Sequence, residues 1–304
     1  MTAGAQGRSL ELYFIDGKPD GMLTAEVFNW TGHVLMAPRT QITEALKRKE
    51  AGYTGVYILL GEQDGKPLAY VGEAEEIGKR IRDHAAVKDW WTSAVLVATA
   101  GDALHKAHVK YLESRLVEIA REIGSVPLEN GNTPPRPSLP EAHIANMEAF
   151  LDYLLMVLPA LRIDVFLSKK RPTTPITADN QSAAVPVFEL VNRKHGIKAT
   201  AKLTGGEFVV QEGSAARNEW TGDTTDKTSY WKLFNELVEQ GILKPAGRSR
   251  VFAANYAFTS TSAAGAVVNG RSTRGPTEWK LKGTGQTYKE WEAEQLSAGG
   301  VSGE

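Results

Sequence analysis

Five side chains between residues 57 and 113 have the chemistry needed to hydrolyse a phosphodiester bond. Tyr57 and Tyr70 lie in two successive strand-like runs, Arg80 and His84 are four residues apart, and Glu113 lies in a later amphipathic run. An arginine fork matches the charge on phosphoryl oxygens, and a carboxylate binds a hard divalent cation. A tyrosine or histidine can orient or deprotonate water. Together these residue types predict metal-assisted phosphodiester hydrolysis.

Two predicted elements position the tyrosines, the arginine and the histidine. Residues 55–60 and 68–71 have strand composition, and Asp64-Gly65 between them favours a hairpin turn. After Gly72 the apolar period changes to three and four residues, which predicts a helix with the arginine and the histidine on one face. The glycine leaves room for a group to approach the backbone closely.

A longer helix, expected over residues 104–123, carries the glutamate. Gly124 follows it, as is typical of a helix C-terminus. Glu113 flanks the apolar face of this helix. The apolar face consists of Val109, Leu112, Leu116, Ile119 and Ile123.

The same residues form a pattern that resembles the GIY-YIG nuclease domain over roughly residues 52–134. Valine replaces both isoleucines of the signature. The matching positions are Gly55-Val56-Tyr57, Tyr70-Val71-Gly72, Arg80, His84, and Lys110-Tyr-Leu-Glu-Ser-Arg-Leu116 followed by Asn130 or Asn132 before Pro134. The resemblance implies a small three-stranded antiparallel sheet flanked by helices and an endonuclease that hydrolyses DNA.

The resemblance also implies a role for each site residue. Glu113 would hold a single Mg²⁺ or Mn²⁺ ion, and Tyr57 would orient or deprotonate the attacking water. Tyr70 would lie near the phosphate, Arg80 would stabilise the transition state, and His84 would help to position water or phosphate. All of these roles are expectations that follow from the resemblance.

Two positions near the site need separate comment. The family often has a lysine after the second glycine, whereas this chain has Glu73. A second carboxylate there could disfavour DNA or help to hold the metal. For the late asparagine that supports the site, we prefer Asn132, which precedes Thr-Pro, over Asn130.

The second part of the chain is similar to a domain of unknown function that recurs after GIY-YIG domains in bacterial proteins. The segments that carry this similarity are residues 207–217, residues 258–264, Gly270-Arg-Ser272 and Trp279-Lys280. We expect this part to target the nuclease or to bind nucleic acid.

The overall expectation is an α/β (α+β) chain with a separate mixed α+β C-terminal domain. The expected divisions are a β-rich N-terminal extension (1–51), the nuclease-like domain (52–135), a helical extension packed on it (136–167), a linker (168–186), the C-terminal domain (187–295) and a disordered tail (296–304).

Composition narrows the function classes. The chain has 304 residues, a net charge of −1 and no cysteine, which excludes disulfides, thiolate zinc sites and a cysteine nucleophile. Positive charge for binding DNA must therefore be local. The candidate nucleic-acid contacts are Lys79, Arg82, Arg193, Lys194, Arg248, Arg250, Arg271 and Arg274.

Other interpretations stay open from sequence. A non-catalytic nucleic-acid-binding or scaffold protein could retain the same residues, RNA could replace DNA, and a homodimer could form. For Asp102, His105 and His108 we favour surface or capping roles over a second metal site. The first residues lack the apolar run of a signal peptide, so we expect a cytoplasmic protein that acts in restriction, defence or repair, and no membrane partner.

Overall fold

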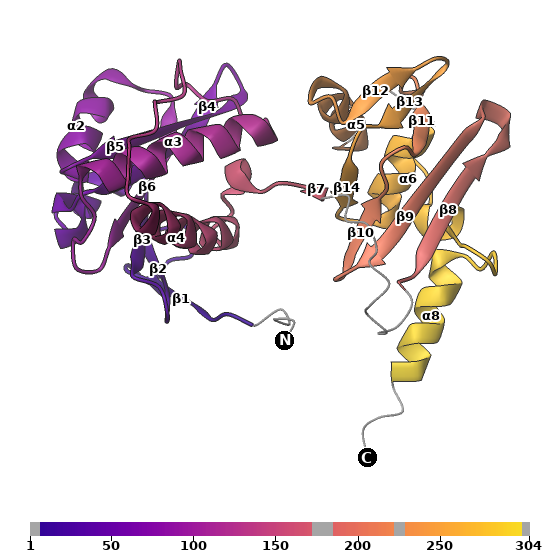
Figure 1. Cartoon of the computed structure of the whole chain (residues 1–304), viewed down its shortest axis with the longest axis horizontal. Helices are drawn as coiled ribbons and strands as arrows, with labels where there is room; N and C mark the ends of the chain where they lie inside the picture. The colour runs from indigo at the N-terminus through magenta and orange to yellow at the C-terminus, as the bar shows by residue number, and fades with distance from the viewer. Residues whose placement is uncertain (1–6, 172–184, 222–228, 300–304) are drawn as a thin grey trace. The chain divides into compact units, whose positions relative to one another are not determined.

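The chain divides into two compact units, Met1–Leu167 and Ser168–Glu304. The structure is a computed structural model, and it describes residues 7–171, 185–221 and 229–299. Both units mix helices with antiparallel sheets, which confirms the predicted α and β class at the coarse level. Figure 1 shows the first unit in indigo to magenta and ends the second unit in yellow.

The first unit is built on one six-stranded antiparallel sheet with the order β1-β2-β3-β6-β4-β5. Its strands are β1 (Leu10–Phe14), β2 (Leu23–Val27), β3 (Gly32–Pro38), β4 (Gly55–Gln63), β5 (Lys66–Ala74) and β6 (Trp91–Thr99). The predicted sheet of three strands is therefore too small. Strand β3 pairs with β6 from Gly32 to Pro38, so the N-terminal strands continue the sheet formed by β4, β5 and β6.

A turn separates β2 from β3 in the N-terminal segment, and in this turn the amide of Trp30 donates to the carbonyl of Val27. The Trp30 ring folds over Gly32, where a Cβ atom would lie 2.1 Å from it. Three short helical pieces follow β3, namely η1 (Arg39–Gln41), α1 (Ile42–Ala45) and η2 (Lys49–Gly52).

Helices cover both faces of the first sheet. The longer elements are α2 (Ile77–Val87), α3 (Lys106–Ile123) and α4 (Glu141–Ala160), with η3 (Asp164–Phe166) after them. Val56 and Ile58 point into a core shared with α3 and α4, whereas Tyr57 and Leu59 point into a core shared with α2. This alternation, inherent to a strand, decides which site residue faces which helix.

The second unit contains two antiparallel sheets, with the strand orders β15-β8-β9-β10-β14-β7 and β11-β13-β12. The strands are β7 (Lys170–Arg171), β8 (Val187–Asn192), β9 (Ile197–Thr204), β10 (Glu207–Val210), β11 (Ala215–Arg217), β12 (Leu243–Ala246), β13 (Ser249–Phe252), β14 (Asn255–Phe258) and β15 (Lys280–Leu281). The helices are η4 (Arg193–His195), α5 (Ser229–Glu239), α6 (Thr261–Asn269), α7 (Gly275–Glu278) and α8 (Tyr288–Gly299). Phe188 and Trp279 are fully buried in its core.

Two predicted boundaries of the second unit change. Lys170 and Arg171, assigned to the linker, pair with β14 as strand β7, and Arg171 forms an ion pair with Glu207. Residues 172–184 of that linker lie outside the described residues. Helix α8 continues to Gly299, beyond the predicted end at residue 295, and residues 300–304 of the predicted tail also lie outside the description. Among the described helices, none combines the length and hydropathy needed to cross a bilayer.

Substitution of Gly55 by alanine should destabilise the first unit. A Cβ atom there would lie 2.2 Å from the backbone carbonyl oxygen of Val97 on β6, and that backbone cannot move without breaking the sheet. We expect a loss of about 2–3 kcal/mol, the upper range for overpacking. Urea denaturation of the full chain, followed by circular dichroism and fitted to two transitions, measures it.

The matched control is Gly52→Ala. Gly52 has no atom within 4 Å of the added Cβ and no left-handed backbone conformation. Its unfolding curve should overlay that of the wild type, and equal losses in the two variants would contradict the steric argument.

Candidate active site at the edge of the first sheet

A buried tyrosine–histidine pair lies at the centre of the site. The hydroxyl of Tyr57 on β4 and Nε2 of His84 on α2 are 2.7 Å apart. Tyr57 pairs across the hairpin with Gly72, and a Cβ atom on residue 72 would lie 2.3 Å from the tyrosine hydroxyl. Glycine at position 72 therefore lets the phenol pass over β5 and reach the histidine.

The electrostatics of this pair keep both side chains uncharged near pH 7. Burial, with Arg80 and Lys88 nearby, lowers the pKa of His84 to about 4, so the imidazole is neutral near pH 7. Burial and the neighbouring Tyr70 raise the pKa of Tyr57 above its usual value. A protonated phenol can donate to the Nε2 of a neutral imidazole whose proton is on Nδ1, and in that tautomer His84 is the acceptor of the pair.

Tyr70 and Arg80 complete this face. The Tyr70 ring on β5 lies 5.1 Å from the ring of His84 and 6.1 Å from that of Tyr57. The exposed Arg80 interacts with the Tyr57 hydroxyl, and this contact raises the pKa of the guanidinium. The arginine therefore offers its remaining N–H groups to solvent directly over the buried pair.

Two carboxylates gather on the α3 side of the sheet. Burial and the charge of Glu73 raise the pKa of Glu113 to about 7, while Lys110, Arg80 and Lys106 oppose the rise. Glu73 forms a 3.5 Å ion pair with Lys106 through Oε1, but its Oε2 is buried without a hydrogen-bond partner among the described residues. The Glu73 oxygen receives no hydrogen bond and lies near a second carboxylate. Oxygen ligands of this kind suit a hard divalent cation.

Strand alternation explains why the tyrosines and the glutamates approach from opposite faces. Glu73 is next to Gly72 on β5, so its side chain points away from the Tyr57 face. Strand β5 is the last strand of the sheet, and Arg80 acts on both Tyr57 and Glu113. Arg80 is therefore near enough to both groups to shift the pKa of each.

The structure places Asn130, and not the preferred Asn132, on the edge of β5. The Asn130 amide accepts from the backbone N–H of Val71 at 3.0 Å and donates to the Val71 carbonyl at 2.7 Å. Arg121 donates to the Asn130 carbonyl. Asn132 is exposed. Residue type could not separate the two, since both precede Pro134 in the same polar loop.

Sequence reasoning missed a polar group beside Tyr70. Lys88 lies over the Tyr70 ring at 5.0 Å and forms an ion pair with Glu129, which also accepts from Nε1 of Trp90 at 3.0 Å. Lys88 follows His84 by four residues, so helical spacing could have indicated it. Trp90 and Trp91 are buried, as packing residues are.

The predicted nucleic-acid contacts do not all remain available. Lys79 and Arg82 are exposed on α2. Arg250 is not available, because it donates to the carbonyls of Asn218 and Leu243 and stabilises β13 and its neighbours. The other predicted contacts are exposed in the second unit: Arg193, Lys194, Arg248, Arg271 and Arg274.

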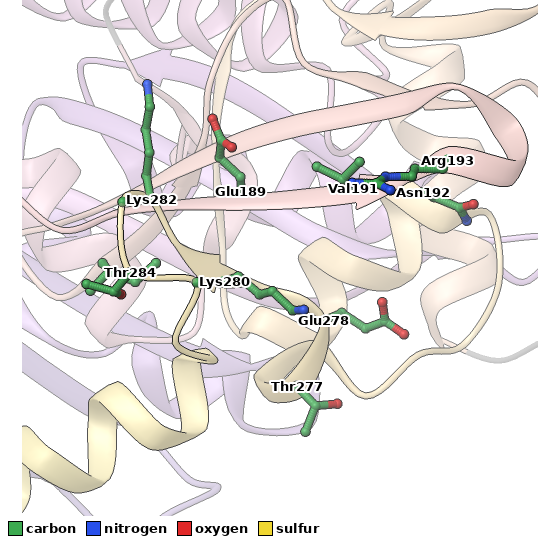
Figure 2. Close-up of a pocket in the computed structure, with 12 residues that line it drawn as sticks. Glu189, Val191, Asn192, Arg193, Thr277, Glu278, Lys280, Lys282 and Thr284 are labelled. Atoms are coloured by element: carbon green, nitrogen blue, oxygen red, sulfur yellow. The ribbon is translucent and has the colours of Figure 1, made fainter.

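Two of these exposed residues come together although they are far apart in sequence. The pKa of His195 is lowered by desolvation and by the charges of Arg217, Lys194 and Arg271, so these three cations are near enough to act on one imidazole. By contrast, the open cavity of about 970 Å³ in this unit has mixed charge, with Arg193, Lys280 and Lys282 beside Glu189 and Glu278 (Figure 2). Positive charge is concentrated at the His195 cluster.

Comparison with known proteins identifies part of the second unit. Residues 188–292 match the family described as a domain of unknown function (DUF4357). This confirms the predicted C-terminal domain of unknown function. The same comparison finds no match to the GIY-YIG family, so that assignment of the first unit stays a prediction. No curated protein and no solved structure matches the chain.

Substitution of Asn130 by alanine should destabilise β5. The change leaves the Val71 N–H and carbonyl without their partner, and each unsatisfied group costs about 1–3 kcal/mol where water cannot replace the bond. Asn132→Ala is the matched control and should change the unfolding free energy by less than about 0.5 kcal/mol. Equal effects in urea denaturation would contradict the assignment to Asn130.

Glu113→Gln should change stability in a pH-dependent way. The raised pKa means that the unfolded chain loses this proton near pH 4.5 and the folded chain near pH 7, so wild-type stability falls across that window. The variant should gain stability relative to wild type between pH 5 and 7, by an amount on the order of 2 kcal/mol. Added Mg²⁺ should reduce the difference. A pH-independent difference in unfolding free energy would contradict the buried-carboxylate argument.

Proposed function

We propose that the first unit is a divalent-metal-dependent endonuclease that hydrolyses phosphodiester bonds in DNA. One observation carries the proposal. The exposed Arg80 interacts with the buried Tyr57–His84 pair and also influences the Glu113 carboxylate, which lies beside Glu73. A phosphate bound to Arg80 would thus have a proton acceptor on one side and a cation-binding carboxylate pair on the other.

The proton-transfer role belongs to Tyr57 and His84 together. Tyr57 is fully buried and its pKa is raised, so its phenolate is not available as a free base. The neutral His84 can accept the phenol proton as Tyr57 takes one from water. Tyr70 and Arg80 would hold the phosphate at this pair, and the guanidinium would stabilise the charge that develops on its oxygens.

The metal role belongs to Glu113 and Glu73. Oε2 of Glu73 has no hydrogen-bond partner among the described residues, and the pKa of Glu113 is raised. Both observations indicate that a bound cation would stabilise the two carboxylates. A Mg²⁺ or Mn²⁺ ion held there would act as a Lewis acid toward the leaving oxygen. In this chain, Glu73 would therefore help to hold the metal.

The second unit would deliver the nuclease to its substrate. Its positive charge around His195, from Lys194, Arg217 and Arg271, suits a phosphate backbone. Since the whole chain has a net charge of −1, binding through so local a cluster should be modest and sensitive to salt.

The test is cleavage of supercoiled plasmid by the full chain with Mg²⁺, with and without EDTA. Arg80→Ala and Glu113→Gln should each lower the rate by at least about 10²-fold, the loss expected when one transition-state contact is removed. The matched control is Glu122→Gln, which changes an exposed carboxylate farther along α3 and should cut as wild type does.

The outcomes separate the two function classes. If both site variants still cut the plasmid and EDTA still stops the cutting, the assignment of Arg80 and Glu113 to the active site is wrong. Salt-dependent binding of DNA or RNA by the wild type, with no metal-dependent cleavage, would favour the non-catalytic alternative, in which the Lys106–Glu73 ion pair only closes the edge of α3 against β5. Cleavage of RNA but not of DNA would contradict the proposed substrate and would leave the assignment of the active-site residues unchanged.

A further inference from the structure

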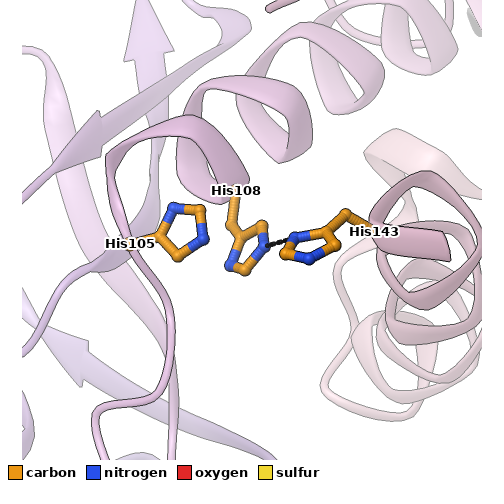
Figure 3. Close-up of side chains that lie close together, drawn as sticks. All are labelled: His105, His108 and His143. Atoms are coloured by element: carbon orange, nitrogen blue, oxygen red, sulfur yellow. Dashed lines mark hydrogen bonds between the residues drawn. The ribbon is translucent and has the colours of Figure 1, made fainter. Parts of the chain in front are cut away.

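Three histidines gather where α3 and α4 begin. The chain has six histidines in all, and one ligand nitrogen from each of His105, His108 and His143 lies within 4.8 Å of the other two. Nε2 of His108 and Nδ1 of His143 are 2.9 Å apart, and the rings of His105 and His108 stack with centroids 3.5 Å apart. Figure 3 shows the three rings side by side between the two helices.

The three histidine rings contact one another, and the side chain of His105 does not cap α3. His105 occupies the N-cap position of α3, but its side chain makes no capping hydrogen bond. The predicted cap, Asp102, instead accepts the backbone N–H of Thr54 at 2.8 Å. His108 follows one turn later on the same helix face, and its Nδ1 is buried without a hydrogen-bond partner among the described residues. The preference for surface or capping roles therefore does not explain the cluster.

The protonation of the cluster favours a cation over an anion. A hydrogen bond between His108 and His143 needs at least one neutral imidazole, and rings stacked at 3.5 Å disfavour charge on both. Neutral imidazoles are ligands for transition metals, whereas they attract phosphate or sulfate weakly.

We propose that His105, His108 and His143 form a transition-metal site of the zinc class that ties the start of α4 to the start of α3. The ion would take the place of the proton shared by His108 and His143. Zn–N bonds of about 2.0–2.1 Å in a tetrahedron need nitrogens about 3.3 Å apart, so the 2.9 Å separation has only to widen slightly.

The ligand set defines the metal class. Three imidazoles suit Zn²⁺, Ni²⁺ or Cu²⁺ and do not suit Mg²⁺, which prefers oxygen ligands. Three protein ligands leave a fourth position for water. A groove of about 360 Å³, lined by His108, Asn146 and Trp30 among others, provides space for it. The site uses no thiolate, as a chain without cysteine requires.

Calorimetric titration of the full chain with Zn²⁺, after removal of any histidine tag, tests the site. We expect one Zn²⁺ per chain, and Co²⁺ should give the visible absorption of a tetrahedral site. His143→Gln and His105→Gln should each weaken binding at least about tenfold, because loss of even an outer-shell partner costs 10- to 100-fold. His105 is exposed, so its replacement should leave the fold intact.

Two controls keep this test separate from the nuclease proposal. His195→Gln removes an exposed histidine of the second unit and should bind Zn²⁺ as wild type does. Glu113→Gln should also retain Zn²⁺ binding, whatever its effect on cleavage. Saturating Zn²⁺ should raise the melting temperature of wild type and not that of His143→Gln. Absence of saturable Zn²⁺ binding, unchanged affinity in both histidine variants, or binding of inorganic phosphate in place of Zn²⁺ would overturn the proposal.

Discussion

The pairing of Tyr57 with Gly72 across β4 and β5 is the constraint on which the candidate site depends. It sends the phenol over a position that has no side chain and onto His84, and it puts the neighbouring Glu73 on the opposite face. A shift of one residue in this register would exchange the two faces of the whole strand. The extensive pairing of β4 with both β5 and β6 fixes that register, so the sheet itself, more than any side-chain contact, sets the arrangement of the site.

The electrostatics follow from the same geometry. The face with the tyrosines is buried by α2, and burial keeps Tyr57 protonated and His84 neutral. On the other face, α3 brings Glu113 close to Glu73, and two carboxylates in a partly buried place repel each other. One side of the edge therefore holds a tyrosine and a histidine that are both uncharged, and the other holds two carboxylates. The charges of Lys110, Arg80 and Lys106 only partly offset the repulsion between these carboxylates.

Local sequence patterns predicted the helices and strands that carry the site better than they predicted how these elements pair with the rest of the sheet. The hairpin, α2 and α3 follow from turn composition and apolar period, and these are the elements that hold Tyr57, Arg80 and Glu113. The pairing of β3 with β6 could not be read from the sequence, because it depends on a contact between segments about sixty residues apart. The position of Asn130 could not be predicted for a similar reason, since only the folded chain shows which asparagine reaches Val71. His143 was missed because no local spacing links it to His105 and His108.

The loop of residues 127–130, which bonds to the outer edge of β5, affects how this sheet can associate with other chains. Residues 127–130 bond to the outer edge of β5 at Ala69 and Val71, partly through backbone and partly through the Asn130 amide, which acts like an added peptide group. That stretch of the edge is thereby closed to an incoming strand. At the other end of the sheet, β1 has Leu12, Tyr13 and Phe14 exposed. Within the described residues, growth of the sheet by strand addition is therefore directed to the side far from Tyr57 and Arg80, and self-association there would leave the candidate site uncovered.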